Sequence, residues 1–520
     1  MKLTKISLAA TLALTMSLQA GTVDTVADTA KKATDNMKFD GQLKLWYQTM
    51  NHDGISNGQA DKGFFMRDTN QPNEWGNIEA QLSVSGNANE HLKYKVTAMT
   101  VTTMGIDNQI TVGQTTRPSQ FGASNGNDAQ PFWFHEAYLD YVLTKNTDLK
   151  AGRTEFTSPF IYTEKWNATA NSFEALVATN TDIPKTTVIG AWIAKGNGAT
   201  DNFEYAPQVF GAESKFSNFG GYVNRTTTTG KTFIKDNTGA DTTDYIETTE
   251  VNEERIATGG AAVLGVKNNT LSFMPIQAWG YLVTDAAQAL WVQGDAGMKD
   301  LGPIDKVGLQ LIGASIGTTG GVKNAIENNK FAKQDAAENK TKDTMAAAAK
   351  LSVKSGIFGV YAAYSKTSAG NLPVANMATN YKKTKLPTAS IFNDGMVAAQ
   401  PNTQAVKIAA TAKFEGIGNL LVSYGSYTVG QNAGYYNPNQ KTGGPASMGV
   451  IAQDLGKDLD MNEFDIKFTT KVKDIDLAAM YINVDKTYVP ILGDSANGGT
   501  TQEYGTIGDQ IIRIIATLKF

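Results

Sequence analysis

Alternation of apolar and polar side chains at every second residue is the feature that most limits how this chain can fold. Residues 510–520 show it clearly, because one row of alternate positions is entirely apolar and the other is mixed. Successive side chains of a β-strand point to opposite faces, so this segment has one apolar face and one partly polar face. Its length matches a tilted membrane-spanning strand of about 9–11 residues. The apolar row is Ile512, Ile514, Ala516, Leu518 and Phe520.

The same alternation recurs along the chain and defines twenty strand candidates. Alternation alone does not separate a soluble β-sandwich, whose apolar face is a core, from a membrane barrel, whose apolar face meets lipid. The candidates lie near 39–49, 75–86, 92–101, 134–143, 149–156, 173–179, 187–194, 206–215, 220–225, 256–266, 271–283, 291–298, 307–316, 346–354, 357–366, 405–414, 419–429, 461–472, 475–485 and 510–520.

The connections between these candidates alternate between short turns and long polar segments, which favours an outer-membrane barrel with short periplasmic turns and long extracellular loops. We expect 226–249, which is rich in threonine, to be irregular, and 325–349 to carry a short helix. The long connections lie near 51–74, 102–133, 226–254, 318–344, 367–404, 431–460 and 486–509.

The beginning of the chain predicts export. Residues 1–20 combine a basic start with an apolar run and resemble a cleaved signal peptide, the alternative being a buried helix. We therefore divide the chain into a signal peptide (1–20), a short periplasmic segment (21–37) and a barrel domain (38–520). The net charge of −4, which becomes more negative without the two lysines of 1–20, argues against nucleic acid as a partner.

On the polar rows of the strands, charged residues of both signs recur, and in a barrel they would line the interior. A pore selects solutes by its width and by the charges at its narrowest point. The candidate lumen-lining residues are Asp40, Lys44, Glu79, Lys93, Lys95, Asp465, Lys467 and Lys471, together with Glu136 and Asp140.

The segment 134–193 carries the most specific motifs. They read EAYLDY at 136–141, LKAGR at 149–153, TSP at 157–159, NSFEA at 171–175 and TNTDIP at 179–184. This pattern resembles the OprD-type outer-membrane porins, especially the branch of the campylobacterial major outer-membrane porins. The resemblance implies an all-β transmembrane antiparallel barrel of 18 strands, usually trimeric, with the third long loop folded inward. We predict about 18 strands, with 16 to 20 compatible with the alternation.

The resemblance also implies that residues 154–172 form the pore constriction. By alternation, Arg153 shares a face with Leu149 and Ala151, so it would reach the pore only if Gly152 forms a bulge or the strand has already ended. The candidate constriction residues are Arg153, Glu155, Glu164, Lys165, Trp166, Glu136 and Asp140.

The predicted function is a porin for passive diffusion of ions and small hydrophilic solutes across the outer membrane of a Gram-negative bacterium. Two alternatives are a non-conducting barrel acting in surface adhesion or envelope structure, and a soluble secreted β-protein. We expect no enzyme, no cofactor and no metal, because the chain lacks cysteine and its three histidines show no ligand-type spacing. The expected partners are membrane lipid and lipopolysaccharide, the outer-membrane assembly machinery, with Phe520 as its signal, and further copies of the chain in a homotrimer.

Overall fold

The computed structural model describes most of the expected barrel domain. The expected signal peptide and residues 21–36 lie outside the described residues. The described residues are 37–53, 64–65, 74–103, 132–165, 168–197, 217–218, 222–235, 241–256, 259–327, 341–379, 383–392, 397–431, 458–492 and 502–520.

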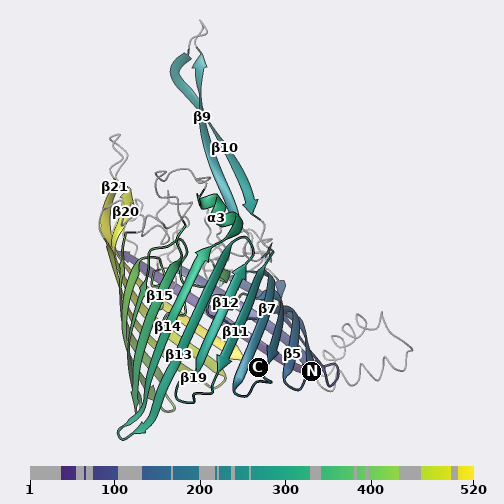
Figure 1. The fold of residues 1–520 in the computed structure, drawn as a ribbon. Helices are drawn as coiled ribbons and strands as arrows, with labels where there is room; N and C mark the ends of the chain where they lie inside the picture. Colours follow the sequence, from purple (N-terminus) through teal and green to yellow (C-terminus); the bar gives the residue numbers. More distant parts are fainter. Residues whose placement is uncertain are drawn as a thin grey trace, which may run out of the picture.

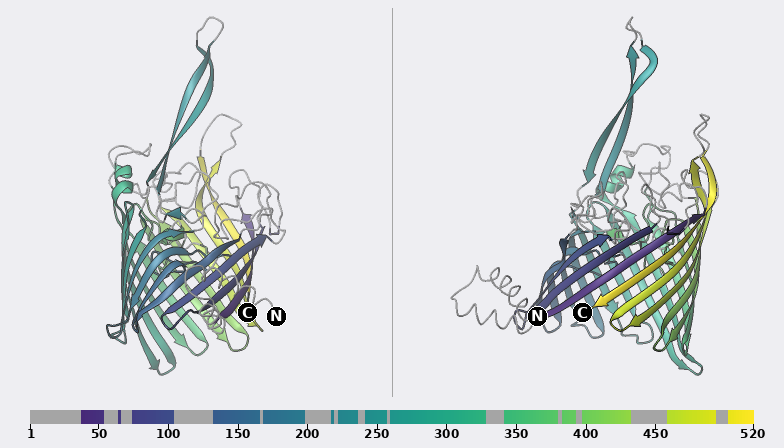
Figure 2. Two further views of the ribbon diagram at one scale, coloured as in Figure 1. Left: turned by 90° about the vertical axis from the view of Figure 1, so that its right-hand side faces the viewer. Right: turned by 180° about the vertical axis from the view of Figure 1, so that it is seen from behind.

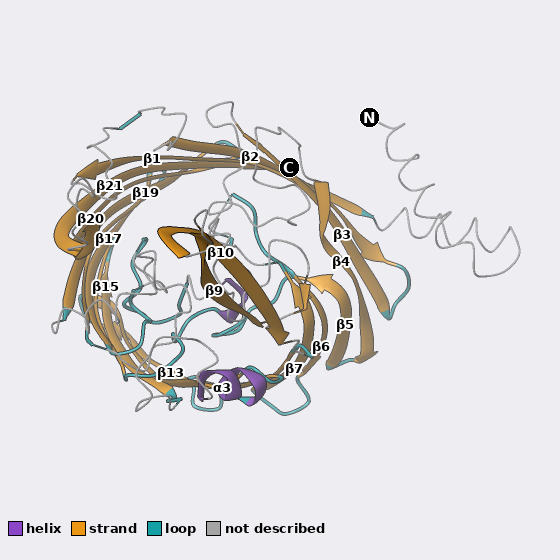
Figure 3. Ribbon diagram, turned by 90° about the horizontal axis from the view of Figure 1, so that it is seen from above, coloured by secondary structure: helices purple, strands orange, loops and turns teal. Residues whose placement is uncertain are grey.

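Eighteen antiparallel strands pair edge to edge and close into a barrel (Figures 1 and 3). A two-residue strand, β8 (Ser217–Asn218), adds only a short pairing to the end of β7. The barrel strands are β1 (Lys38–Asp53), β2 (Glu74–Asn87), β3 (Leu92–Thr103), β4 (Phe132–Thr144), β5 (Thr147–Thr154), β6 (Phe173–Asn180), β7 (Thr186–Gly196), β11 (Ala261–Asn268), β12 (Ile276–Val283), β13 (Ala287–Leu301), β14 (Ile304–Thr318), β15 (Thr344–Ser355), β16 (Phe358–Thr367), β17 (Thr403–Phe414), β18 (Gly418–Val429), β19 (Leu459–Val472), β20 (Ile475–Leu492) and β21 (Gln502–Lys519).

The barrel closes where β1 pairs with β21, from Gln42 opposite Lys519 to Asp53 opposite Gly508. Two backbone hydrogen bonds between Gly41 and Phe520 continue this seam, with N···O distances of 2.6 and 3.0 Å. A Cβ atom on Gly41 would lie 2.2 Å from the Phe520 ring, so a larger residue there would require the ring to move. Closure leaves neither β1 nor β21 with a free edge.

The alternation sorts side chains between the two faces of the wall as predicted. Leu43 and Ile514 are 43% and 42% exposed on the outer face, whereas their neighbours Lys44 and Arg513 are buried on the inner face. Many other large apolar side chains are exposed on the outside, Leu290 and Ile408 among them. Such a continuous apolar exterior is typical of a surface whose solvent is lipid.

The first barrel strand, β1, begins at the rim that carries the short turns, and the last, β21, ends at the same rim (Figure 2). The opposite rim carries the long connections, except for the three-residue link 284–286 between β12 and β13. Among the described residues no helix is long and apolar enough to span a membrane.

The structure corrects three details of the sequence prediction. The candidate 220–225 belongs to β9 (Tyr222–Lys235), which pairs with β10 (Asp241–Ile256) in a hairpin above the rim (Figure 1), so 226–249 is not irregular where the structure describes it. The candidate 206–215 lies outside the described residues. The helix expected within 325–349 is α3 (Gly320–Glu327), and the alanines 346–349 belong to β15. Strands β20 and β21 extend into the connection expected at 486–509.

Candidate functional site

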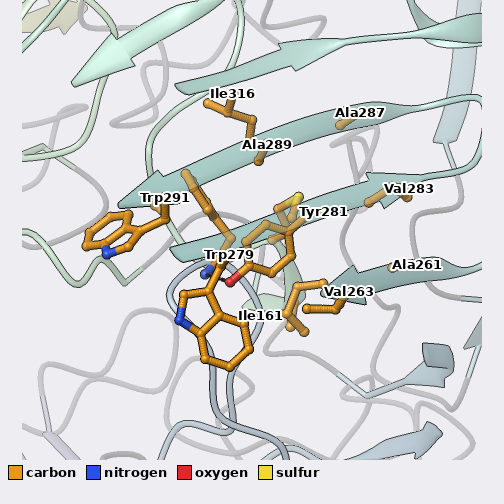
Figure 4. Packing of buried hydrophobic residues seen from close by; sticks show 14 of the residues in the cluster. Ile161, Ala261, Val263, Trp279, Tyr281, Val283, Ala287, Ala289, Trp291 and Ile316 are labelled. Carbon is orange, nitrogen blue, oxygen red and sulfur yellow. Dashed lines mark hydrogen bonds between the residues drawn. The ribbon is translucent and has the colours of Figure 1, made fainter. Parts of the chain in front are cut away.

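The connection between β5 and β6, residues 155–172, folds into the barrel (Figure 3), and we name it the constriction loop. Its Phe160 is fully buried, and its ring lies 5.5 Å from the ring of Tyr281 on β12 and 5.8 Å from that of Trp291 on β13. Both pairs are edge-to-face, the favoured aromatic geometry. Ile161 lies beside Trp279 and Tyr281 in the same apolar cluster (Figure 4). The expected inward third loop is therefore confirmed.

Within the constriction loop, short-range hydrogen bonds fold the chain back on itself. Ser158 Oγ donates to the carbonyl of Ile161 at 2.7 Å, and the amide of Thr163 donates to the carbonyl of Phe156 at 2.7 Å. Together with the fixed φ of Pro159, these bonds hold Phe160 and Ile161 at the tip of the loop. The hydrogen bonds that shape the tip therefore lie within the constriction loop itself.

A second inward segment, residues 368–402 between β16 and β17 (the second loop), packs against the constriction loop. The amide of Met377, in the short 3₁₀-helix Met377–Thr379, donates to the carbonyl of Phe160 at 2.8 Å. Val374 and Leu386 are buried in the cluster that also contains Phe160. Sequence reasoning treated 367–404 only as a polar connection. The signal that could have identified it is its apolar content, which a solvated loop does not need.

On the opposite side, the constriction loop meets a charged part of the wall formed by β1 to β4. Lys165 Nζ lies 2.5 Å from Glu155 Oε2 within the loop. Lys44 Nζ on β1 donates to the backbone carbonyl of Lys165 at 2.9 Å. On β3 and β4, Lys95 forms an ion pair with Glu136. We name these five residues, together with Glu79 and His135, the charged cluster.

Glu79 and Glu136 are both nearly fully buried and have polar partners. Gln42 Nε2 donates to Glu79 Oε2 at 3.1 Å, and Lys44 faces Glu79 in the register of β1 and β2. Thr97 Oγ1 donates to Glu136 Oε2 at 3.1 Å. Because each carboxylate has a nearby donor or cation, the cost of removing it from water is offset.

Glu155 connects the constriction loop to the barrel wall. Its Oε1 lies 3.1 Å from Nε2 of His135, which is fully buried on β4. Burial alone would raise the pKa of the Glu155 carboxyl, but hydrogen bonds from His135 and Lys165 and their positive charges outweigh this effect and lower the pKa to about 2. Glu155 therefore stays ionised across the physiological range.

His135 reaches the interior because β4 contains a β-bulge. Thr97 pairs with Glu136 and Ala98 with Phe134, so His135 is the extra residue. As a result both His135 and Glu136 are buried on the inner face. Strict alternation places only Glu136 there, so the inward position of His135 was not predicted from the sequence.

Arg153 does not line the pore, and its expected place at the constriction is corrected. Strand β5 continues to Thr154, and its pairing places Arg153 opposite Ala137 on β4 and Glu174 on β6. Glu174 lies between Phe173 and Ala175, which are buried in the interior cluster, so its own side chain points outward. Arg153 Nη2 lies 2.6 Å from Glu174 Oε1, and Lys195 Nζ lies 3.5 Å from Glu174 Oε2. Gly152 has a φ of +123°, but the register remains unbroken there and the side chain of Arg153 stays outside.

The structure places the other predicted constriction residues in different surroundings. Glu164 is buried, and its carboxylate accepts a hydrogen bond from Asn376 of the second loop at 3.0 Å. Asp140 lies on the inner face of β4 opposite Lys93 and Lys150, nearer the short turns than Glu136. Trp166 lies outside the described residues.

Of the remaining lumen candidates, Asp465 is fully buried and accepts a hydrogen bond from Ser423 at 2.8 Å. Lys471 lies 3.9 Å from Asp476 near the short-turn rim, and Asp40 is exposed at the start of β1. Lys467 lines a cavity of about 500 Å³ on the wall of β14 to β19. Four more lysines line it, namely Lys306, Lys350, Lys354 and Lys413.

Comparisons with solved structures agree with this fold. The chain is similar to Acinetobacter baumannii OccAB1, with a TM-score of 0.59 and 13% identity over 93% of this chain and 97% of that one. It is similar to Pseudomonas aeruginosa OccK9 (OpdG), with a TM-score of 0.59 and 11% identity over 94% and 99%. It is also similar to Pseudomonas aeruginosa OccK2 (OpdF) in complex with glucuronate, with a TM-score of 0.56 and 10% identity over 94% and 99%.

These neighbours are porins of the OprD family, so the resemblance seen in the motifs at 136–184 holds at the level of the fold. The narrower resemblance to the campylobacterial branch stays a prediction. No family model matches the chain, and no curated protein sequence is similar to it.

Proposed function

We propose that this protein is an outer-membrane porin, a water-filled channel for passive diffusion of ions and small hydrophilic solutes, and that it is not an enzyme. The observation that carries the proposal is the constriction loop, which crosses a closed barrel and ends at a charged cluster. The apolar outer face supports a lipid environment, and the inward charges support a wet interior. A narrow passage with fixed charges of both signs selects solutes by size and charge.

The favoured solutes in this proposal are anionic. The cavity near the short-turn rim is lined by five lysines, and no Asp or Glu lies among the described residues that line it. Lys350 is further oriented by the ring of Tyr361, 4.2 Å from its Nζ. A solute leaving the constriction would pass this positive surface. The similar structure of OccK2 holds glucuronate, an anion, which is consistent with this direction.

We further propose that the chain lies in the outer membrane of a Gram-negative bacterium after removal of 1–20, in contact with lipid and lipopolysaccharide, and as a homotrimer. Phe520 is proposed as the signal read by the assembly machinery. Its exposed ring, which lies over Gly41 at the seam, is accessible on the outer face.

Surface attachment is a second candidate function, favoured by one observation. The β9–β10 hairpin rises above the rim that carries the long connections (Figure 2), and among the described residues its two strands pair only with each other. Their outer edges could therefore pair with a partner strand.

Reconstitution in planar bilayers tests the main proposal. Purified, heat-modifiable barrel should produce stepwise ion conductance, and the reversal potential in a salt gradient should have the sign of anion preference. Folded protein that inserts but does not conduct would contradict the porin proposal and leave surface attachment. Conductance with cation preference would keep the porin and reject the role of the lysine-lined cavity.

A further inference from the structure

Asn376 of the second loop joins the two inward loops at the middle of the constriction loop. Its side-chain Oδ1 accepts a hydrogen bond from the amide of Tyr162 at 3.2 Å, and its Nδ2 donates to the carbonyl of Tyr162 at 3.0 Å. The same Nδ2 also donates to Glu164 Oε1 at 3.0 Å. Asn376 is fully buried. The side-chain amide of Asn376 thus pairs with both the backbone N–H and the backbone carbonyl of Tyr162, as the backbone of a neighbouring β-strand would.

The contact depends on the chemistry of an amide. Asn376 uses Oδ1 as an acceptor for Tyr162 and Ala378, and Nδ2 as a donor to Tyr162 and Glu164. An ionised carboxylate of the same shape accepts hydrogen bonds but donates none. It would also place a second negative charge beside the buried carboxylate of Glu164.

The second loop is itself fixed to the barrel wall, so Asn376 connects the constriction loop to a rigid support. Lys407 Nζ on β17 donates to the carbonyl of Ala389 at 2.7 Å. The amide of Phe392 donates to Glu463 Oε1 on β19 at 2.7 Å. Tyr427 of β18 donates from its hydroxyl to the carbonyl of Thr388 at 3.1 Å. Three consecutive strands therefore hold the loop that carries Asn376.

We propose that Asn376 is a positioning residue that holds the constriction loop in its inward place and so sets the width of the pore. The residue does not touch the solute in this proposal. It acts through Tyr162 and Glu164, which lie between the loop tip at Phe160 and the charged pair of Glu155 and Lys165. The effect on pore width rests on the proposed porin function, whereas the effect on loop mobility does not.

The test compares N376D with the double variant N376D/E164Q. In N376D the donor to Glu164 is lost and two carboxylates face each other. In the double variant, the amide of the new glutamine can donate to the new aspartate, so the hydrogen bond returns with reversed direction. The matched control is N371D, which adds the same charge to the same loop where Asn371 accepts a hydrogen bond from the amide of Lys342.

Two readouts are measured on each refolded, heat-modifiable barrel. Hydrogen exchange reports the amides of 160–164, and single-channel recording reports conductance and open-channel noise. We expect N376D to speed exchange of these amides by about tenfold or more, because losing a hydrogen bond to a charged group alone accounts for about a tenfold change. We also expect it to raise conductance and open-channel noise. We expect N376D/E164Q to restore part of both, because the hydrogen bond to position 164 returns whereas the donor to the Tyr162 carbonyl does not. We expect N371D to leave both unchanged.

The outcomes distinguish the positioning role of Asn376 from the proposed porin function. Wild-type exchange and conductance in N376D would overturn the positioning role, as would a double variant no better than N376D. If N376D does not fold, N376A replaces it. N376A lacks the hydrogen bonds of the amide but adds no negative charge beside Glu164, and it should also show faster exchange of the amides of 160–164. Unchanged exchange in N376A would overturn the positioning role of Asn376. Should the wild-type barrel not conduct at all, the porin function fails, while the exchange data still decide whether Asn376 holds the loop.

Discussion

The constriction loop touches two walls of very different character. On the side of β12 and β13 it is held by aromatic packing, with Phe160 enclosed by Tyr281 and Trp291. On the side of β1 to β4 it is held by charges, with Glu155 between His135 and Lys165. Packing of this kind has no titratable group, whereas charge pairs in contact with water respond to pH and are screened by salt. The constriction loop is therefore held by two kinds of contact that should respond differently to pH, salt and mutation.

Removal of the aromatic anchor should have the largest effect. Phe160→Ala deletes a fully buried ring, a change that typically costs about 3–5 kcal/mol. The cost falls on the loop rather than on the strand pairing, so the barrel should form and its conductance should rise. Single-channel recording measures this. Phe358→Ala, at a position 60% exposed on the outer face, is the control and should leave conductance unchanged. An unaltered conductance in Phe160→Ala would mean that the apolar wall does not position the loop.

Neutralising a charged residue of the constriction loop should change the ion selectivity of the pore rather than its width. Glu155→Gln removes a negative charge and should increase anion preference, and Lys165→Gln should decrease it. Each shift should be about twofold in permeability ratio, because partly solvated charges in salt interact by less than ~1 kcal/mol. Reversal potentials in a salt gradient measure both, with Lys145→Gln in a short turn as control. Shifts of the same sign in both variants would refute the assignment of these charges to the pore.

The charged wall should also have a pH limit that the apolar wall lacks. The folded pKa of Glu155, about 2, lies below its usual value of 4.5, so its ionised contacts stabilise the loop above pH 4.5 and are lost as the pH falls towards 2. Selectivity should therefore change little between neutral pH and about pH 5, and approach that of Glu155→Gln near pH 2. Recording both proteins across this range checks the prediction. A transition near neutral pH in the wild type, absent from Glu155→Gln, would contradict the low pKa.

The smallest effect is expected at Arg153, which lies on the outer face. Arg153→Gln should leave the reversal potential unchanged and alter stability by no more than about 1 kcal/mol, through its pair with Glu174. Chemical denaturation and bilayer recording test the two statements separately. A changed ion preference would show that Arg153 faces the pore and would contradict its outward position inferred from the strand pairing.

The wall of the barrel was predictable because its signal is local. Alternation needs only neighbouring residues, and it placed Lys44, Glu79 and Lys95 on the inner face. It also placed Arg153 outside, against the position that the family resemblance implied. Eighteen of the twenty candidates correspond to barrel strands, and one of the two others belongs to a hairpin that is paired only with itself.

The site was less predictable because its contacts join distant parts of the chain. Asn376 and Tyr162 are 214 residues apart, and no periodic pattern connects them. The bulge at His135 is a one-residue change of register, which alternation cannot reveal without the partner strand. Glu164 was identified as a charged loop residue, but its burial follows from the second loop, whose inward path was not predicted from the sequence.

The seam between β1 and β21 has a consequence for biogenesis. Its first pair, Gln42 and Lys519, joins positions near opposite ends of the described chain. In the finished barrel every intervening strand is paired as well, so the seam completes a wall without a free edge. A chain that stalls earlier exposes two unpaired edges, the kind of surface on which strands of other molecules aggregate.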